Sequence, residues 1–352
     1  MARQLIKGNE AIAEAAVRSG CRYYFGYPIT PQSEIPEYMS ARLPEVGGTF
    51  IQAESEISAI NMVYGAAAAG GRAMTSSSSP GISLKQEGIS YIAASDVPCV
   101  IVNVMRAGPG LGGIQPSQGD YFQAVKGGGH GDYKLIVYAP SSVQEAADYT
   151  YKAFDVADKY RMPVMILCDG LLGQMMEGVE LPPMRDLSQL PQKDWALRGW
   201  DGSGERRIIN SLRIQPDELE RYIDELYRKY DTIKQNETQV EEYLCDDAEI
   251  IFASYGIVAR ICKSAILKLR KMGIKAGLIR PITLFPFPEE TFKKHAARDN
   301  VKKFVAVELS KGQMVEDVRL AVDGKKPVGF YGRTGGNVMN EDDLASFIAG
   351  GK

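Results

Sequence analysis

The sequence predicts an α/β protein with a larger parallel-sheet domain followed by a smaller α/β domain. The 352 residues, of which 45% are hydrophobic and 24% charged, can bury a large core and are long enough for two domains. Apolar runs of strand length alternate with amphipathic stretches of helix length, which is the order of an α/β fold. This alternation stops near Leu181 and starts again near Glu249.

The first domain is expected to span residues 1–181. Its continuous apolar runs suit strands that are buried on both faces of a parallel sheet. Ser142, or Ser141 beside it, can cap the helix that crosses between the last two strands. The predicted strands are Arg22–Gly26, Val97–Val104, Leu135–Tyr138 and Val164–Cys168, and the predicted helices are Asn9–Ser19, one that begins at Glu56, and Ser141–Tyr160.

Residues 182–247 are predicted to form a connector, because prolines and a Gly/Arg-rich patch replace the alternation. A polar helix should begin near Pro216, and a stripe at helical spacing should pack on a neighbouring surface. The stripe consists of Leu219, Tyr222, Ile223, Leu226, Tyr227 and Tyr230. Residues 248–352 then form the second domain, with strands at Glu249–Ala253, Lys275–Ile279 and Phe304–Glu308 and a helix at Ile257–Met272.

Composition excludes several classes of function. A net charge of -3 without dense basic runs gives no reason to bind nucleic acid. Residues 1–8 lack a signal-peptide core, and no run approaches the ~20 apolar residues of a membrane span, so we expect a cytoplasmic protein without membrane contact. Five scattered cysteines form no C-x-x-C pair, and the two histidines make histidine-based metal sites poor candidates. We assign no metal ligand to this chain.

The first candidate motif is Gly26–Pro31, which follows a predicted strand. Two prolines fix its backbone and place the hydroxyl of Thr30 at the carboxyl end of the strand, where α/β sheets bind ligands. The alternative is that Thr30 caps the next helix with Pro31 in its first turn. Both interpretations can hold together.

Glu56 is the second candidate, at the start of a helix whose buried face follows it. An acidic residue in a first turn can simply complement the helix dipole. A partly buried carboxyl at such a place is also suited to share a proton with a ring nitrogen. The run Met74–Gly81, between a predicted strand and a predicted helix, offers small side chains and bare backbone to a flat ligand, or forms a plain polar turn.

Arg106 follows another predicted strand and precedes a glycine-rich loop. It can grip a substrate carboxylate with two hydrogen bonds, or pair with a surface acid. The loop matches G-x-G-x-x-G at Gly108, but a proline and a glycine stand where the helix of a dinucleotide site should begin, so we reject that site. His130 lies in a second glycine loop, where it either contacts a ligand or is an ordinary loop residue.

Taken in order, four motifs resemble the α subunit of 2-oxoacid:ferredoxin oxidoreductases. Two later motifs are similar to the transketolase C-terminal-type domain that follows in these subunits, so the resemblance spans nearly the whole chain. Within the family, the branched-chain (2-oxoisovalerate) branch is the most similar. The four motifs are Tyr27–Pro31, Ser55–Glu56, Ser79–Gly81 and Met105–Pro109, and the later two are Ser254–Gly256 and Arg280–Pro286.

The resemblance implies a thiamine diphosphate pyrimidine-binding domain. In it, Glu56 would hydrogen-bond the aminopyrimidine N1′ and promote the imino tautomer that deprotonates the thiazolium C2. Thr30, Arg106 and Gly108 would face the 2-oxoacid, with Glu56, Thr30 and Arg106 as the catalytic residues. The implied coenzyme-binding residues are Tyr27, Pro28, Ile29, Thr30, Glu56, Ser79, Pro80 and Gly81.

The resemblance also implies partner chains, because the coenzyme carries the chemistry and this sequence holds only part of its site. A β subunit would supply Mg²⁺, the diphosphate site and a [4Fe-4S] cluster, alongside a γ and a ferredoxin-like δ subunit. Coenzyme A would accept the acyl group, and ferredoxin the electrons.

The substrate and the acceptor stay open at this point. The loop reads Gly110-Leu111 where many members have Ser-Thr, which leaves 2-oxoisovalerate, 2-oxoglutarate, pyruvate and aryl 2-oxoacids as candidate substrates. An acyl transfer to lipoamide without ferredoxin, or a non-catalytic scaffold, are the other interpretations.

Overall fold

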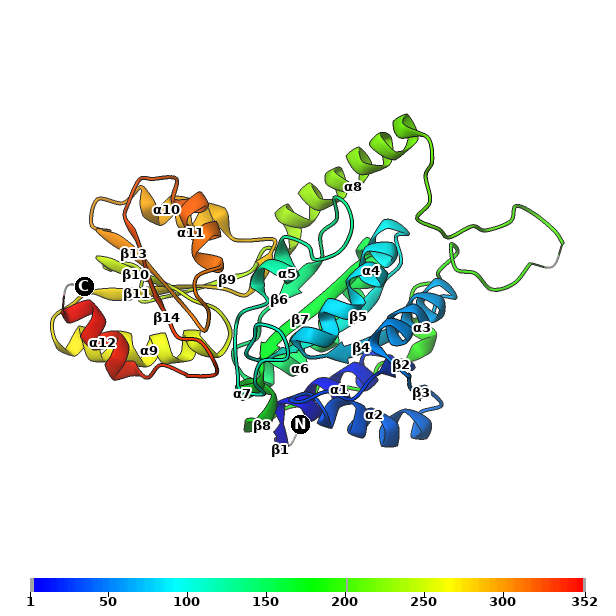
Figure 1. Cartoon of the computed structure of the whole chain (residues 1–352), viewed down its shortest axis with the longest axis horizontal. Helices are drawn as coiled ribbons and strands as arrows, with labels where there is room; N and C mark the ends of the chain where they lie inside the picture. The colour runs from blue at the N-terminus through cyan, green and yellow to red at the C-terminus, as the bar shows by residue number, and fades with distance from the viewer. Residues whose placement is uncertain (1–2, 201, 351–352) are drawn as a thin grey trace.

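The computed structural model describes residues 3–200 and 202–350, which form two α/β units (Figure 1). The first unit is built on a seven-stranded sheet. All neighbouring strands in it are parallel except the edge pair β12 and β6. In sheet order, its strands are β12 (Thr283–Phe285), β6 (Ile136–Tyr138), β7 (Pro163–Asp169), β5 (Cys99–Met105), β4 (Ala73–Ser77), β2 (Tyr23–Gly26) and β3 (Thr49–Gln52).

Helices cover both faces of this sheet, so the strands that they cover can be apolar throughout. One face packs on α1 (Gly8–Arg18), α2 (Glu34–Glu45) and α6 (Val143–Tyr160). The other face packs on α3 (Glu56–Ala68), α4 (Ser79–Ala94) and the short α5 (Tyr121–Val125). At one end, β1 (Gln4–Lys7) pairs with β8 (Met176–Val179), next to α7 (Gly170–Gln174).

The second unit is a five-stranded sheet, parallel except for one edge strand. In order, its strands are β14 (Val328–Gly332), β13 (Lys303–Glu308), β10 (Ile250–Ala253), β11 (Ala276–Pro281) and β9 (Val240–Tyr243). Its helices are α9 (Gly256–Lys271) and α12 (Glu341–Ala349) on one face, and α10 (Glu289–Ala296) and α11 (Met314–Val322) on the other.

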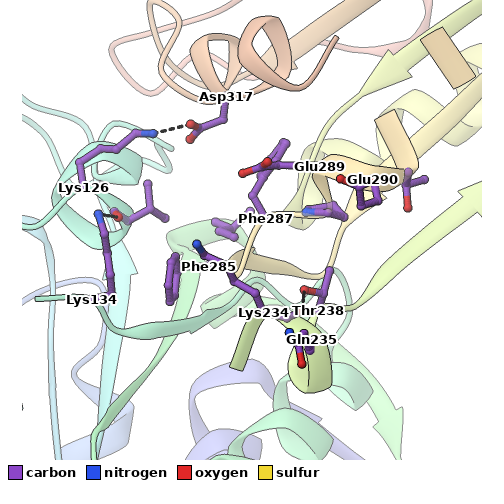
Figure 2. Close-up of a pocket in the computed structure, with 14 residues that line it drawn as sticks. Lys126, Lys134, Lys234, Gln235, Thr238, Phe285, Phe287, Glu289, Glu290 and Asp317 are labelled. Carbon is purple, nitrogen blue, oxygen red and sulfur yellow. Dashed lines mark hydrogen bonds and ion pairs between the residues drawn. The ribbon is translucent and has the colours of Figure 1, made fainter. Parts of the chain in front are cut away.

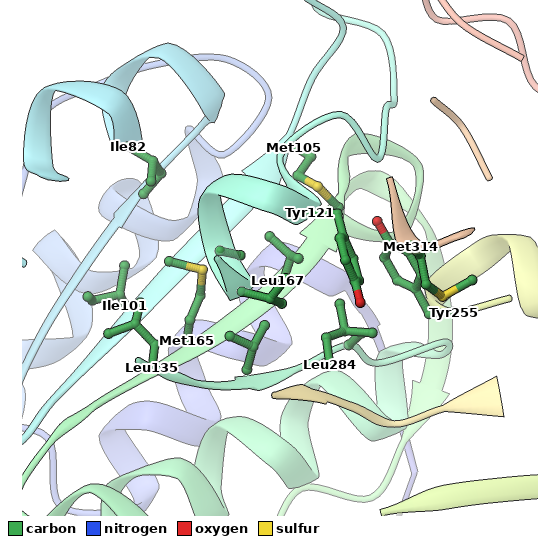
Figure 3. Close-up of a cluster of buried hydrophobic side chains, with 14 of the residues drawn as sticks. Ile82, Ile101, Met105, Tyr121, Leu135, Met165, Leu167, Tyr255, Leu284 and Met314 are labelled. Atoms are coloured by element: carbon green, nitrogen blue, oxygen red, sulfur yellow. The ribbon is translucent and has the colours of Figure 1, made fainter. Parts of the chain in front are cut away.

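The two units share apolar and charged contacts. Figure 3 shows Tyr121 of the first unit facing Tyr255 of the second, with ring centroids 5.7 Å apart. Arg280 on β11 donates to both carboxylate oxygens of Glu145 on α6, at 2.7 and 2.9 Å. Burial alone would raise the pKa of Glu145, but the bonds from Arg280 hold it below its ordinary value. β12 itself crosses from the second half of the chain to the first sheet.

The predicted strands and helices are confirmed as elements, with ends that differ by at most two residues. Ser142 caps α6, since its Oγ accepts a hydrogen bond from the backbone N of Glu145 at 3.1 Å. The domain boundaries at 181 and 247 stay predictions; β9, just before the second boundary, pairs with the second sheet.

One local prediction is wrong and another holds only in part. Thr30 does not cap a helix, because α2 begins at Glu34, after a turn. The predicted stripe of α8 (Pro216–Glu237) is confirmed in part, because Leu226 and Tyr230 are buried and Tyr222 packs against the same core. Tyr227 is exposed, and so is Leu219, in the first part of α8 that extends away from the unit (Figure 1). The 3₁₀ turn at Leu187–Gln189 and an irregular stretch precede this helix.

Candidate active site

The candidate residues gather at the carboxyl ends of β2, β4 and β5, where ligands of parallel sheets bind. The helices that follow β2, β3, β4 and β5 in the chain begin at this same edge of the sheet. Glu56 and Ser79 are the first residues of α3 and α4, so their positions follow directly from the strand-to-helix connections. These motifs therefore lie at one edge of the sheet.

The segment Tyr27–Pro31 follows β2 and is held by side chains from distant parts of the chain. Asn9 Nδ2 and Gln174 Nε2 both donate to the carbonyl oxygen of Pro31, at 2.8 and 3.1 Å. The peptide bond between Thr30 and Pro31 is cis. Tyr27, Pro28 and Thr30 are exposed and Ile29 is half-buried, so this segment presents its side chains at the surface.

Glu56 is buried, with 6% of its surface exposed, at the start of α3. Ser55 caps this helix, because its Oγ accepts from the backbone N of Ser58 at 3.2 Å. Among the described residues, none donates a hydrogen bond to the Glu56 carboxylate. A β-carbon at Gly81 would lie 2.6 Å from Glu56 Oε1, so only glycine lets α4 approach the carboxylate this closely.

The end of β4 is polar and completely buried, which is unusual for a central strand. Thr75, Ser76, Ser77 and Ser78 have no exposed surface. The hydroxyls of Ser77 and Ser78 lack a hydrogen-bond partner among the described residues. The interpretation of this run as a plain turn is wrong, since it forms the end of β4 and the cap of α4.

Arg106 holds the glycine loop against the segment after β2. Its Nη1 donates to the carbonyl oxygen of Thr30 and its Nη2 to that of Leu111, each at 3.0 Å. The side chain is largely buried, and its Nε has no partner among the described residues. Arg106 is therefore not a surface ion-pair residue. Gly108 follows it, joined to Pro109 by a cis peptide bond.

Sequence reasoning missed a polar cluster beside Arg106. Ser79 Oγ and Asn103 Nδ2 donate to the same oxygen of Asp120, at 2.5 and 3.0 Å. Burial raises the pKa of the Asp120 carboxyl. Ser79 Oγ also accepts a hydrogen bond from the backbone N of Arg106 at 3.0 Å. An asparagine within the apolar run of β5 was the available signal.

Sequence reasoning also missed Lys85, which is fully buried on α4. Its Nζ donates to Thr75 Oγ1 at 2.8 Å and to the carbonyl oxygen of Ser76 at 3.2 Å. Lys85 lies three residues after Ile82 and four before Ile89, which are both buried, so its spacing already placed it on the apolar face.

A cavity of about 550 Å³ opens beside these residues, between the two units. The first unit contributes Ser79, Arg106 and the glycine loop to its lining. The second unit contributes Lys311 and Thr334. Thr30 lines a neighbouring cavity of about 420 Å³ together with Ile114 and α7. The site therefore consists of two neighbouring cavities, one lined by Arg106 and the other by Thr30. A hydrogen bond from Arg106 to the carbonyl oxygen of Thr30 connects their walls.

A separate cavity of about 640 Å³ contains none of the candidate residues (Figure 2). Phe285 and Phe287 form its apolar part, and Lys126 pairs with Asp317 across it. Burial lowers the pKa of Lys134 there. Three lysines and three carboxylates line this cavity, so its charges balance and do not select an anion.

The remaining candidate features are His130, the glycine-rich motif at Gly108 as a dinucleotide site, and possible metal ligands in the described residues. His130 is exposed and lines none of the three cavities above. After Gly113 the described chain stays irregular until α5, so the helix that a dinucleotide site requires is not found at that position. In residues 3–200 and 202–350, no three His, Cys, Asp or Glu side chains are grouped so that they could hold a metal ion.

Family models match both halves of the chain. One described as pyruvate flavodoxin/ferredoxin oxidoreductase, thiamine diphosphate-binding, matches residues 14–242. Another, described as pyruvate:ferredoxin oxidoreductase core domain II, matches residues 248–344. No helix within the described part of the chain is long and apolar enough to cross a membrane.

Curated relatives and a solved structure agree with these models. The ketoisovalerate oxidoreductase subunit VorB of Methanothermobacter thermautotrophicus is 52% identical over 99% of this chain and 97% of its own. The 2-oxoglutarate synthase subunit KorA of Methanocaldococcus jannaschii is 37% identical over 99% of both chains. A 2-oxoglutarate:ferredoxin oxidoreductase from Magnetococcus marinus superposes with a TM-score of 0.87 and 25% identity, over 99% of this chain and 65% of that one.

Proposed function

Because this chain belongs to the thiamine-diphosphate-dependent 2-oxoacid:ferredoxin oxidoreductase family, as a subunit of a multi-subunit oxidoreductase, we propose that it binds the pyrimidine half of the coenzyme at Glu56. The observation that carries the proposal is a buried carboxylate, without a hydrogen-bond donor among the described residues, at a sheet edge. Such a carboxylate is suited to bond a protonated ring nitrogen.

The residues around Glu56 fit a flat heterocycle. Gly81 lets α4 pack directly against the carboxylate, and the buried hydroxyls of Ser77 and Ser78 still have free hydrogen-bonding capacity. We assign Tyr27, Pro28, Ile29 and Thr30 to the rim of the same site, and Ser79 and Pro80 to its floor at the start of α4. When bound, the coenzyme would supply the nucleophile for the 2-oxo group and the electron sink for decarboxylation.

We assign Arg106, Thr30 and Gly108 to the substrate. The free Nε of Arg106 can donate to the carboxylate of a 2-oxoacid, while its Nη atoms keep the loop in place. Thr30, which is exposed, lies on the segment that Arg106 holds. Gly108 lines the cavity without a side chain, which leaves space for the substrate.

We propose 2-oxoisovalerate as the substrate. The support is the identity of 52% to a subunit named for ketoisovalerate, against 37% to one named for 2-oxoglutarate. Exposed Leu111 and Ile114 in the glycine loop are apolar, which suits a branched aliphatic side chain better than a second carboxylate. Acyl-CoA, CO₂ and reduced ferredoxin would be the products.

We also propose that this chain works in a complex with partner subunits. A β subunit would hold the diphosphate, Mg²⁺ and a [4Fe-4S] cluster, and γ and δ subunits would complete the complex. The chain spans 65% of the Magnetococcus neighbour, whose structure holds 2-oxoglutarate, coenzyme A and succinyl-CoA, so more polypeptide takes part there than this chain provides. We propose the cytoplasm as the location.

Replacement of Glu56 by glutamine tests the central assignment. Glutamine keeps the shape of the side chain but cannot exchange a proton at neutral pH. In the complex reconstituted with its partner chains, we expect E56Q to assemble normally and to turn over at least ~10²-fold more slowly, the scale of lost acid–base catalysis. Coenzyme-A-dependent dye reduction with 2-oxoisovalerate measures the rate.

Glu54 provides a matched control, because it is an exposed glutamate two residues earlier in the chain. E54Q should retain the wild-type rate. A wild-type rate in E56Q would remove Glu56 from the mechanism. Faster reduction with 2-oxoglutarate than with 2-oxoisovalerate would overturn the substrate assignment and leave the reaction class intact.

A further inference from the structure

Lys85 occupies a place in the core where a lysine is costly. Its side chain is fully buried on α4, and its Nζ makes two hydrogen bonds, to Thr75 Oγ1 and to the carbonyl oxygen of Ser76. An ammonium group has three N–H donors, so one stays without a partner among the described residues. Burying a charge without an ion pair costs several kcal/mol in general. Structural packing alone would be served better by an apolar side chain.

The charge environment of Lys85 contains Glu56. Burial lowers the pKa of Lys85 to about 7, and the negative charge of Glu56 on α3 acts in the opposite direction. The side chains that hold Lys85 on β4 are neutral. Tyr24 on β2, whose hydroxyl bonds Ser76 Oγ at 2.6 Å, is kept neutral because burial raises its pKa. Asp120 bonds Ser79 at the start of α4, and burial raises its pKa as well.

Glu56 and Lys85 thus share one buried polar region. Gly81, one helical turn before Lys85, lies against both Ser77 Oγ and Glu56 Oε1. The hydroxyls of Ser77 and Ser78 in this region lack partners among the described residues. A ring bound at Glu56 would therefore lie near the buried ammonium group of Lys85.

We propose that Lys85 is a positioning residue that acts through Glu56: its ammonium group favours the ionised carboxylate and so sets the pH at which Glu56 exchanges a proton with the pyrimidine ring. The inference rests on the proposed function, because it needs the ring at Glu56. The Glu56 carboxylate and the ring share one proton. A nearby cation favours the loss of this proton, because it stabilises the negative charge that remains on the carboxylate. Removing that cation must move the proton loss to higher pH.

Three substitutions separate charge from packing. K85M removes the charge and the hydrogen bonds, K85Q removes the charge but keeps hydrogen-bonding capacity, and K85R keeps the charge. The near-ultraviolet circular dichroism of the bound pyrimidine ring, followed against pH in the complex without substrate, reports its protonation state. We expect the midpoint to rise by about one pH unit in K85M and K85Q, within the usual range for loss of an opposite charge, and to stay near the wild-type value in K85R.

An unchanged midpoint in K85M and K85Q would overturn the inference, and so would a midpoint in K85R displaced as far as in K85M, because packing would then be the cause. If K85M does not assemble, as size-exclusion chromatography would show, K85Q decides alone. E56Q separates the two proposals. If E56Q keeps the wild-type transition, the proposed role of Glu56 fails; if E56Q abolishes it and K85Q leaves it unmoved, only the role of Lys85 fails.

Discussion

Arg106 combines two tasks in one guanidinium group. Two of its nitrogens donate to the carbonyl oxygens of Thr30 and Leu111, which join the segment after β2 to the glycine loop. Its third nitrogen, Nε, has no partner in the described chain. A rigid planar fork allows this division, because its five N–H donors point in fixed directions. Lysine could not divide its donors in the same way.

We therefore expect R106K to raise the KM for the 2-oxoacid by about tenfold or more. That factor corresponds to about 1.4 kcal/mol, a cautious value for one hydrogen bond to a charged group. Steady-state dye reduction with the reconstituted complex gives KM and kcat. R319K, on the exposed surface of α11, is the control and should leave both constants unchanged. A wild-type KM in R106K would remove Arg106 from the substrate site.

The starts of α6 and α2 show how much a capping serine determines where a helix begins. α6 begins after Ser142, whose Oγ accepts a hydrogen bond from the N–H of Glu145, and its spacing of apolar residues fits one face of a helix. Ser33 has the same position before α2, but its side chain makes no capping bond. The two serines therefore form a matched pair for measuring a cap.

S142A should lower the free energy of unfolding by about 1 kcal/mol, the usual loss for an N-cap serine. S33A should change it by much less, because it removes no capping bond. Urea unfolding of the two variants beside the wild type measures the difference. Equal losses in both variants would mean that the bond from Glu145 contributes nothing to stability.

Local signals predicted most elements but not the contacts between distant segments. Thr30 was misread as a cap because Asn9 and Gln174, far away in the sequence, hold the adjacent carbonyl in a turn. Arg106 and Ser79 could be predicted because each lies just after a strand, and Glu56 because it begins a helix. Asp120 was missed because its partner Ser79 lies 41 residues away, and no local pattern reveals such a pair.

At the scale of the whole molecule, buried polar groups fix the second unit on the first. Gln118 donates from Nε2 to the carbonyl oxygen of Tyr255 at 3.0 Å and accepts from the N–H of Leu309 at 3.0 Å. Asp169, at the end of β7, accepts hydrogen bonds from the backbone N–H groups of Leu171 and Leu172 in α7, and the backbone N–H of Ile257 in α9 also favours its ionised form. Leu309 lines the cavity at Arg106 and Leu171 lines the neighbouring cavity, so the orientation of the units helps to shape the site.

Asp169 makes this junction sensitive to pH. Burial raises the pKa of its carboxyl from 3.8 to about 6. Because the folded-state pKa exceeds the unfolded one, the stability linked to this proton is fully present below about pH 4 and is lost as the pH rises through about 6. A shift of about two units corresponds to about 3 kcal/mol. The wild type should lose this amount between about pH 4 and about pH 7.

D169N should not show this loss, because an amide does not titrate and its oxygen can still accept the N–H groups of α7 and α9. We expect the free energy of unfolding of D169N, measured relative to the wild type, to rise by up to about 3 kcal/mol over that range. Urea unfolding at several pH values measures it, with D299N on an exposed loop as the control. Parallel pH profiles for wild type and D169N would show that Asp169 stays ionised in the fold, and that its hydrogen bonds from the two units compensate for its burial.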